Sequence, residues 1–171
     1  PVFARWMRLL GQIPGSVLWL KQTGARTRIN LLAAAQAHGI APDRLIFAGP
    51  AALEVHLARH RLADLFLDTA PYGAHATACD ALWAGLPVLT RRGTAFASRV
   101  ASSLLTAAGL AELIAESWDD YEALALTLAR DPARLAGLKQ KLATAHKTAP
   151  LFDTPRLTRD LEALYRRMLT T

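Results

Sequence analysis

Short apolar runs alternate along the chain with stretches in which apolar residues recur at helical spacing. The apolar runs are 17–20, 45–48, 65–67, 87–90 and 112–115. Their length and composition are typical of strands buried in a parallel sheet. The stretches between them predict helices over 27–38, 77–84 and 97–108, and a short helix that begins near Leu53. This alternation predicts an α/β fold, with a parallel sheet, helices on both faces and right-handed crossovers.

Both ends of the chain have helical patterns. An apolar stripe at helical spacing opens the sequence, formed by Val2, Phe3, Trp6, Met7, Leu9, Leu10 and Ile13. No capping residue precedes this stripe, so we expect residues 1–171 to be a single C-terminal lobe of a longer protein. Further along, a capping box runs from Ser117 to Asp120, and a proline follows both Asp131 and Thr154. These start signals predict a helical C-terminus.

Composition narrows the class of protein. Hydrophobic residues make up 52% and charged residues 20% of the chain, which fits one packed domain and excludes a disordered one. The single cysteine cannot form an internal disulfide. No apolar run approaches the roughly 18 residues that span a bilayer. We therefore expect a protein of the cytoplasm with no membrane partner.

The net charge of +6 favours a partner that carries phosphate, because arginine offers phosphate a planar fork of donors. The basic stretches do not interleave aromatic residues in the manner of single-strand binders, so we expect no nucleic-acid partner. An ordinary basic surface is the alternative explanation of the charge. Neither a Gly-rich dinucleotide fingerprint nor a Walker motif is present.

Parallel sheets of this kind bind ligands beyond the carboxyl ends of their strands. The loop after 65–67 leads into a helix start rich in small residues, including Ala76. Such a start is an anion site that a pyrophosphate can approach closely. Thr77 adds a hydroxyl donor and His75 an imidazole, while Asp80, one turn into the helix, can accept hydrogen bonds from ribose hydroxyls. An equally good interpretation is that Thr77 and Asp80 form a capping box with no ligand.

A second candidate lies after the strand 45–48. Backbone groups near Ala51 can read the edge of a base, with His56 stacked on it and Arg59 beside it. The alternative is that His56 and Arg59 are ordinary residues of a helix surface.

A zinc site is a further possibility. His56 and His60 are spaced as i and i+4, and so are His75 and Cys79. The two pairs fall on different elements, and a cysteine in an Ala-rich helix is more often a buried apolar filler. We therefore predict no metal site, and a nucleophilic cysteine inside a helix is disfavoured.

Several ordered motifs resemble the O-GlcNAc transferase family, SPINDLY-like members included. Within 62–106 these are Leu-Ala-Asp-Leu-Phe-Leu-Asp-Thr, Gly-Ala-His-Ala-Thr-Ala-Cys-Asp-Ala-Leu-Trp-Ala-Gly-Leu-Pro-Val-Leu-Thr and Ala-Ser-Arg-Val-Ala-Ser-Ser-Leu-Leu-Thr. The segments 13–20, 44–47 and 150–154 also fit. The resemblance covers nearly the whole chain, and the shared order of its motifs makes it specific.

The resemblance implies the donor-binding lobe of a GT-B glycosyltransferase, a Rossmann-like C-terminal half. It implies inverting, metal-independent transfer of N-acetylglucosamine from UDP-GlcNAc, the donor substrate, to protein Ser or Thr hydroxyls, with no cofactor. By the same resemblance the residues that bind the UDP-sugar divide into three sets. The Ala51 backbone, His56 and Arg59 face uracil; His75, Ala76 and Thr77 hold the diphosphate and sugar; Asp80 binds ribose.

Two positions depart from the family pattern. Leu53 stands where the family usually has a lysine near the uridine, and Ala76 where it has a threonine. Arg91 and Arg92 are candidate cations to compensate for the missing lysine. The resemblance also implies partners outside this chain: the acceptor protein or peptide, an N-terminal lobe that carries the catalytic residues, unknown here, and TPR repeats. The alternative function is a non-catalytic Rossmann-like module that has lost transferase activity.

Overall fold

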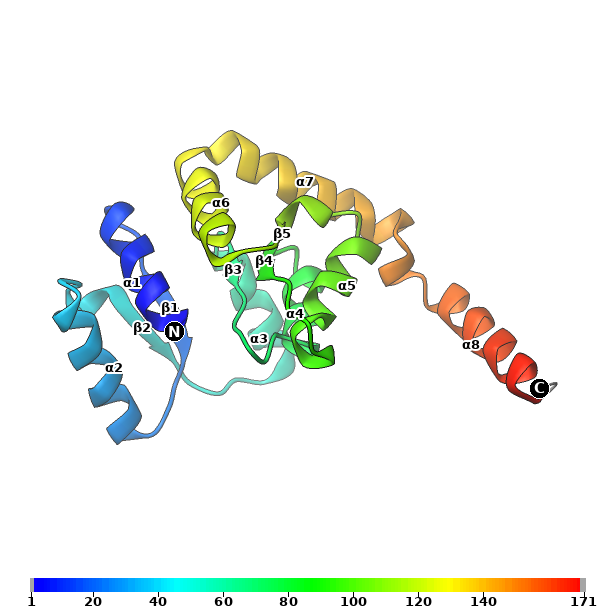
Figure 1. The fold of residues 1–171 in the computed structure, drawn as a ribbon, viewed down its shortest axis with the longest axis horizontal. Coiled ribbons are helices and arrows are strands. Elements are labelled where there is room, and N and C mark those ends of the chain that lie inside the picture. The colour runs from blue at the N-terminus through cyan, green and yellow to red at the C-terminus, as the bar shows by residue number, and fades with distance from the viewer. Residues whose placement is uncertain (1, 170–171) are drawn as a thin grey trace.

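The structure, a computed structural model, describes residues 2–169 (Figure 1). Within this range five short strands alternate with helices, and three further helices follow the last strand. The elements are α1 (Val2–Gln12), β1 (Leu18–Lys21), α2 (Ala25–Ala37), β2 (Leu45–Ala48), α3 (Leu53–Arg59), β3 (Phe66–Leu67), α4 (Ala76–Trp83), β4 (Val88–Arg91), α5 (Val100–Ala107), β5 (Ile114–Ala115), α6 (Trp118–Arg130), α7 (Pro132–Thr148) and α8 (Thr154–Leu169). The predicted alternation of strands and helices is confirmed.

Strand β4 lies at the centre of a three-stranded parallel ladder, between β3 and β5. Its successive side chains point to opposite faces, as in any strand. Val88 packs into a cluster that includes Leu82 of α4 and Leu105 of α5, whereas Leu89 packs with Leu9 of α1 and Tyr121 of α6. Helices therefore cover both faces of this sheet, as the sequence predicts.

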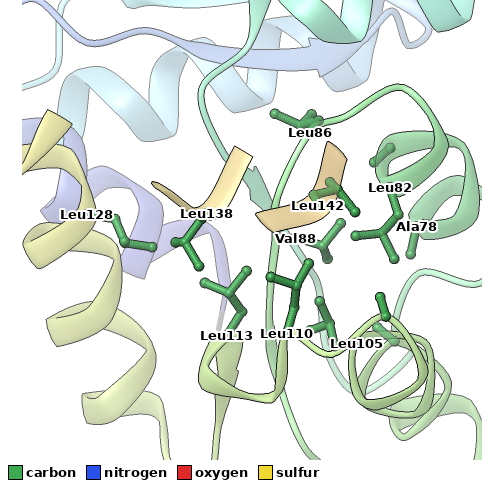
Figure 2. Close-up of a cluster of buried hydrophobic side chains, with 13 residues drawn as sticks. Ala78, Leu82, Leu86, Val88, Leu105, Leu110, Leu113, Leu128, Leu138 and Leu142 are labelled. Atoms are coloured by element: carbon green, nitrogen blue, oxygen red, sulfur yellow. The ribbon is translucent and has the colours of Figure 1, made fainter. Parts of the chain in front are cut away.

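Figure 2 shows the larger core on the Val88 face. Leu138 and Leu142 of α7 reach over Val88, Leu110 and Leu113, so that α7 closes the core from above α5 and β5. Val88, Leu110, Leu113 and Leu142 have no exposed surface. Complete burial of one such side chain contributes roughly 1.5–3 kcal/mol, so this cluster contributes substantially to stability.

Strands β1 and β2 form a second parallel ladder, in which Leu18 pairs with Leu45. Helices α1 and α2 cover one of its faces, where Met7 and Ala35 are buried. On the other face Trp19 and Ile46 are 36% and 43% exposed. The five strands thus form two ladders in the described residues, and not one continuous sheet.

Helix α1 joins the two ladders (Figure 1). Met7 packs on the β1–β2 side, whereas Leu9 packs against Leu89 on the β4 side. Polar contacts reinforce the second interface, since Glu122 of α6 accepts hydrogen bonds from both Arg5 and Arg8. The apolar stripe at the start of the chain is therefore an amphipathic helix that is buried against both halves.

Element boundaries agree with the sequence where a local cap fixes them. Asp120 N donates to Ser117 Oγ (3.0 Å) in a complete capping box, and Arg134 N donates to Asp131 Oδ1 (2.9 Å). At α8 the predicted cap is one residue late, because Arg156 N donates to Asp153 Oδ1 (2.9 Å). A carboxylate accepts a stronger bond than a hydroxyl at the positive end of a helix.

The predicted strand over 112–115 is also too long. Residues 111–113 form a turn of 3-10 helix, Ala111–Leu113, which leaves Ile114–Ala115 as the strand. Leu113 is fully buried in the core. Its packing there favours the 3-10 turn over the extended strand that the apolar pattern predicts. Similarly, the predicted helix over 97–108 is divided into a 3-10 turn, Phe96–Ser98, and α5.

Helix α8 projects from the rest of the molecule at the red end of Figure 1. None of its described residues is buried, and an apolar stripe that includes Leu157, Leu161 and Leu164 is exposed. Across residues 2–169 no helix combines the length and apolar content needed to cross a membrane.

The Glu122 contacts predict a pH-dependent contribution to stability. The hydrogen bond from Arg8, followed by that from Arg5, lowers the pKa of Glu122 below its usual value of 4.5. Glu122→Gln should lower the free energy of unfolding by about 1 kcal/mol at pH 7. The difference should be present above pH 4.5 and disappear as the pH falls through the lowered pKa.

Urea unfolding at a series of pH values measures this effect. Asp160→Asn is the matched control, because Asp160 makes an exposed pair with Arg156 at 3.7 Å and should contribute less than about 0.5 kcal/mol. Equal effects of the two substitutions on the free energy of unfolding would contradict the stabilising role given to the Glu122 hydrogen bonds.

Candidate functional site

The candidate site begins at the amino end of α4, where the chain leaves β3. His75 occupies the N-cap position, and its backbone carbonyl accepts from the N–H groups of Ala78 (3.0 Å) and Cys79 (3.1 Å). No side chain in the described part of the chain caps this helix, and both Ala76 and Thr77 are exposed. An uncapped helix start combines backbone donors with a partial positive charge, and this combination binds anions.

The capping-box interpretation of Thr77 and Asp80 is wrong. A capping threonine stands ahead of the first helical residue, but α4 already begins at Ala76, so Thr77 is its second residue. The helix begins earlier than predicted because the residue before it, His75, is held in place by the neighbouring segment. Asp80 consequently stands one turn into α4, with its carboxylate not used for capping.

Contacts on three sides fix the His75 ring. It stacks on Tyr72, with 4.9 Å between ring centroids and 17° between planes, and meets the edge of Phe96 at 6.0 Å. Its Nε2 lies 3.2 Å from the backbone oxygen of Ala97. Because a carbonyl can only accept, Nε2 carries the proton in this contact.

The second half of the site is α3, where Arg59 organises His56. The Arg59 guanidinium donates to the Gly49 carbonyl (2.8 Å) and to His56 Nδ1 (2.7 Å). Guanidinium has no acceptor, so His56 Nδ1 must be unprotonated and the imidazole neutral, with its proton on Nε2. His60 adds an edge-on contact with the His56 ring at 4.6 Å.

The electrostatics favour the same neutral form. Desolvation, followed by the charges of His60 and Arg59, lowers the pKa of His56 below 6.5, and the opposing effect of Asp80 is smaller. His56 therefore presents a neutral ring with a donor at Nε2 at neutral pH.

The structure brings His56 and Asp80 together. His56 Nε2 lies 3.9 Å from Asp80 Oδ2, and both side chains are partly exposed, at 29% and 36%. Ala51 lies in the loop before α3, and Leu53 is the first residue of that helix; both are exposed. A flat ring, a carboxylate and an anion-binding helix start thus occur on two helices that contact each other.

The reasoning from sequence missed the residues that hold this arrangement in place. Asp68, at the end of β3, is 2% exposed, and its carboxylate accepts hydrogen bonds from the loop that leads to α4. Tyr72 and Ala97 fix the His75 ring. An aspartate directly after an apolar run and before a Pro- and Gly-containing loop was the available signal for Asp68.

Comparison with known proteins identifies the family. The profile of Glycosyl transferase family 41 matches residues 1–161. The chain belongs to glycosyl transferase family 41.

Two similar proteins are much longer than this chain. It is 38% identical to the probable UDP-N-acetylglucosamine–peptide N-acetylglucosaminyltransferase SEC of Arabidopsis thaliana, over 95% of this chain and 17% of that protein. It is 35% identical to the UDP-N-acetylglucosamine–peptide N-acetylglucosaminyltransferase of Caenorhabditis elegans, over 95% of this chain and 14% of that protein. The chain thus spans less than a fifth of the length of these curated relatives.

A solved structure agrees with this assignment. A mutant of the Thermobaculum terrenum O-GlcNAc transferase superposes with a TM-score of 0.91 and 35% identity, over 98% of this chain and 33% of that one. The predicted fold class is therefore confirmed, and so is the resemblance on which the family prediction rested.

The two arginines at the carboxyl end of β4, Arg91 and Arg92, contact the segment that leads into α6. Arg91 lies over the Trp118 ring, 5.0 Å from its centroid, and Arg92 pairs with Glu116 at 3.1 Å. These contacts are with the segment that starts α6. The structure gives no contact of either arginine with Leu53, the position at which family 41 was expected to carry a lysine.

Cys79 is exposed, which contradicts its prediction as a buried filler. Its side chain lies on the solvent-facing side of α4, whereas Ala78 and Leu82 face the core. Partial desolvation, with a smaller effect of the Asp80 charge, raises the pKa of the Cys79 thiol above 9.0, so the thiol is protonated at neutral pH.

Among residues 2–169, no three His, Cys, Asp or Glu side chains gather as a metal site would require.

The Arg59 contact predicts the titration of His56. Arg59→Ala should raise the pKa of His56 toward 6.5, because it removes a positive charge and the donor that keeps Nδ1 unprotonated. Because the folded-state pKa of His56 lies below 6.5, its effect on stability has a defined sign: stability falls as the pH drops below 6.5.

Imidazole nitrogen NMR across pH 5–8 measures this pKa together with the tautomer. Arg61→Ala on the neighbouring turn should leave both unchanged. If the Nε2–H tautomer and the pKa of His56 are the same in wild type and in Arg59→Ala, Arg59 does not control the ring.

Proposed function

We propose that this chain is the UDP-sugar-binding lobe of an inverting, metal-independent glycosyltransferase. The enzyme would move N-acetylglucosamine from UDP-GlcNAc to Ser or Thr hydroxyls of proteins. One observation carries the proposal: in a family 41 chain, the uncapped start of α4 lies beside the His56–Asp80 pair. A helix start that can bind an anion, beside an aromatic ring and a carboxylate, matches the needs of a nucleoside diphosphate and so supports the proposal.

The nucleoside would bind at α3. The neutral His56 ring offers a stacking surface for uracil, and stacking does not depend on the identity of the base. Selectivity for uracil would come from backbone groups near Ala51. Arg59 donates two of its five N–H groups to Gly49 and His56, so it also holds the His56 ring in place. Its remaining N–H groups are available to the base. Asp80 would accept from the ribose hydroxyls.

The diphosphate would bind at the start of α4. The backbone N–H groups of Ala76 and Thr77 are the first donors of the helix, and the Thr77 hydroxyl adds a third. Alanine in place of threonine at position 76 removes one hydroxyl but keeps its backbone donor. His75, fixed by Tyr72 and Ala97, would flank the sugar and phosphate.

These groups would act on the leaving group. In an inverting transfer, the acceptor hydroxyl oxygen attacks the anomeric carbon opposite the diphosphate, the bond from that carbon to the phosphate oxygen breaks, and UDP leaves with the developing negative charge. The α4 dipole and its donors are preorganised to stabilise that charge. The hydroxyl proton goes to a base for which this chain provides no assigned residue. We propose that the base and acceptor site lie in an N-terminal lobe of a cytoplasmic protein.

The Leu53 position favours a second function. Without a cation at the start of α3, the lobe has one fewer contact for the nucleotide, as expected of a non-catalytic module that retains the fold. Both functions include a nucleotide site, but only the first predicts transfer when the rest of the enzyme is supplied. In both cases we expect the 171-residue chain alone to bind UDP weakly and to show no turnover.

The proposal predicts UDP-selective binding that depends on Asp80. Calorimetry should show that UDP binds more tightly than CDP or ADP, and Asp80→Asn should weaken UDP about tenfold through loss of ribose acceptors. The melting temperature should change little, because Asp80 does not cap α4.

Asp64→Asn provides a matched control, since Asp64 is an exposed aspartate paired with Lys139 at 3.5 Å. This variant should bind UDP as wild type does. Equal binding of UDP, CDP and ADP, or unchanged UDP binding in a folded Asp80→Asn variant, would contradict the proposed site.

A further inference from the structure

The carboxylate of Asp68 is buried under the loop that leads into α4. Its Oδ1 accepts from the backbone N–H groups of Thr69 and Ala74, each at 2.7 Å. Its Oδ2 accepts from the Thr90 hydroxyl, also at 2.7 Å. Both oxygens are thus bonded, and the two backbone donors come from the two ends of one turn of the loop.

The Asp68 backbone belongs to the rigid part of the molecule. Its N–H donates to the Leu89 carbonyl of β4 (2.9 Å), and its carbonyl accepts from the Tyr121 hydroxyl of α6 (3.1 Å). The Tyr121 hydroxyl in turn accepts from Trp6 Nε1 of α1 (3.3 Å). Asp68 therefore connects the loop, which its carboxylate holds, to a strand and two helices of the core, which its backbone contacts directly or through Tyr121.

The loop fits closely around this carboxylate at Gly73. A Cβ atom at this position would lie 3.1 Å from Asp68 Oδ2 and 3.2 Å from the Ala97 backbone oxygen, so a larger residue would push the loop away. The Gly73 N–H itself donates to the Ala97 oxygen (2.9 Å). Two residues later the chain reaches His75 and the start of α4.

We propose that Asp68 is a positioning residue for the diphosphate half of the site. By bonding the N–H groups of Thr69 and Ala74, it fixes the loop so that α4 begins at Ala76 with its first donors open to a ligand. This inference rests on the proposed function. Asp68 itself does not contact the backbone N–H groups of Ala76 and Thr77, but through the loop it determines where they lie. Supporting groups of this kind determine how precisely a binding site is preorganised.

The location of Asp68 gives a selective prediction. The residues proposed for the nucleoside lie on α3 and at Asp80, whereas the loop that Asp68 holds ends at the phosphate donors. Loss of the carboxylate should therefore lower the affinity for UDP but not the affinity for uridine. A generally destabilised fold would weaken both ligands.

The test compares UDP with uridine in wild type, Asp68→Ala and Asp68→Asn. In Asp68→Ala, which loses all three bonds, UDP affinity should fall about tenfold and uridine affinity should change less than twofold. Asp68→Asn should restore most of the UDP affinity, because its single side-chain oxygen can still accept from Thr69 and Ala74. Hydrogen exchange at the Ala74 amide should be fastest in Asp68→Ala and intermediate in Asp68→Asn.

Each outcome decides the inference. Parallel loss of UDP and uridine, or unchanged UDP affinity in folded Asp68→Ala, overturns it while the proposed function stands. A wild-type chain that binds neither ligand contradicts the proposed function and the inference together. If Asp68→Ala does not fold, Asp68→Asn decides: a smaller loss confined to UDP supports the inference, and no loss with unchanged Ala74 exchange overturns it.

Discussion

Burial of strand β4 on both faces is the constraint on which the rest of the structure depends. Val88 and Leu89 have no exposed surface, although they point in opposite directions. Helices α4, α5 and α7 bury Val88 on one side, α1 buries Leu89 on the other, and α6 contributes side chains to both clusters. The strand also fixes its neighbours, because β3 and β5 pair with it in parallel and so end at the same edge.

That edge explains where the candidate site forms. A parallel strand followed by a helix brings the helix start back to the carboxyl edge of the sheet, and the start carries donors that no strand can satisfy. Among residues 2–169 no side chain satisfies them at α4, as is also the case at α2, α3 and α5, whereas α6 and α7 carry side-chain caps. What distinguishes the open start of α4 is its position on the helix that also carries Asp80, close to His56. Family 41 membership gives that feature its proposed ligand.

Sequence patterns predicted the elements whose causes are local. Apolar runs marked the strands, and Ser117 and Asp131 marked helix starts that depend on residues three positions away. Prediction failed where the cause is distant in sequence. Thr77 and Asp80 match a capping box, but the contacts of His75 with Ala97, 22 residues away, place the helix start one residue earlier.

The same reason explains the site residues that the sequence did not reveal. Asp68 has partners at Thr90 and Tyr121, 22 and 53 residues away, and no local pattern reports such pairs. Cys79 was misjudged because exposure depends on which side of α4 packs on the core. His56, Arg59 and Asp80 were predicted as site residues because each belongs to a short motif. The structure brings His56 and Asp80 within 3.9 Å and adds that Arg59 sets the tautomer of His56.

Mapping UDP onto the chain by NMR tests the central claim most directly. In a titration of the ¹⁵N-labelled chain, this account predicts the largest changes in amide chemical shift at Ala51, just before α3, and at Ala76, Thr77 and Asp80 in the first turns of α4. Shifts confined to another surface would contradict it. The groove between α5 and α7, lined by Thr106, Lys141, Thr144 and Pro150 among others, is one such surface.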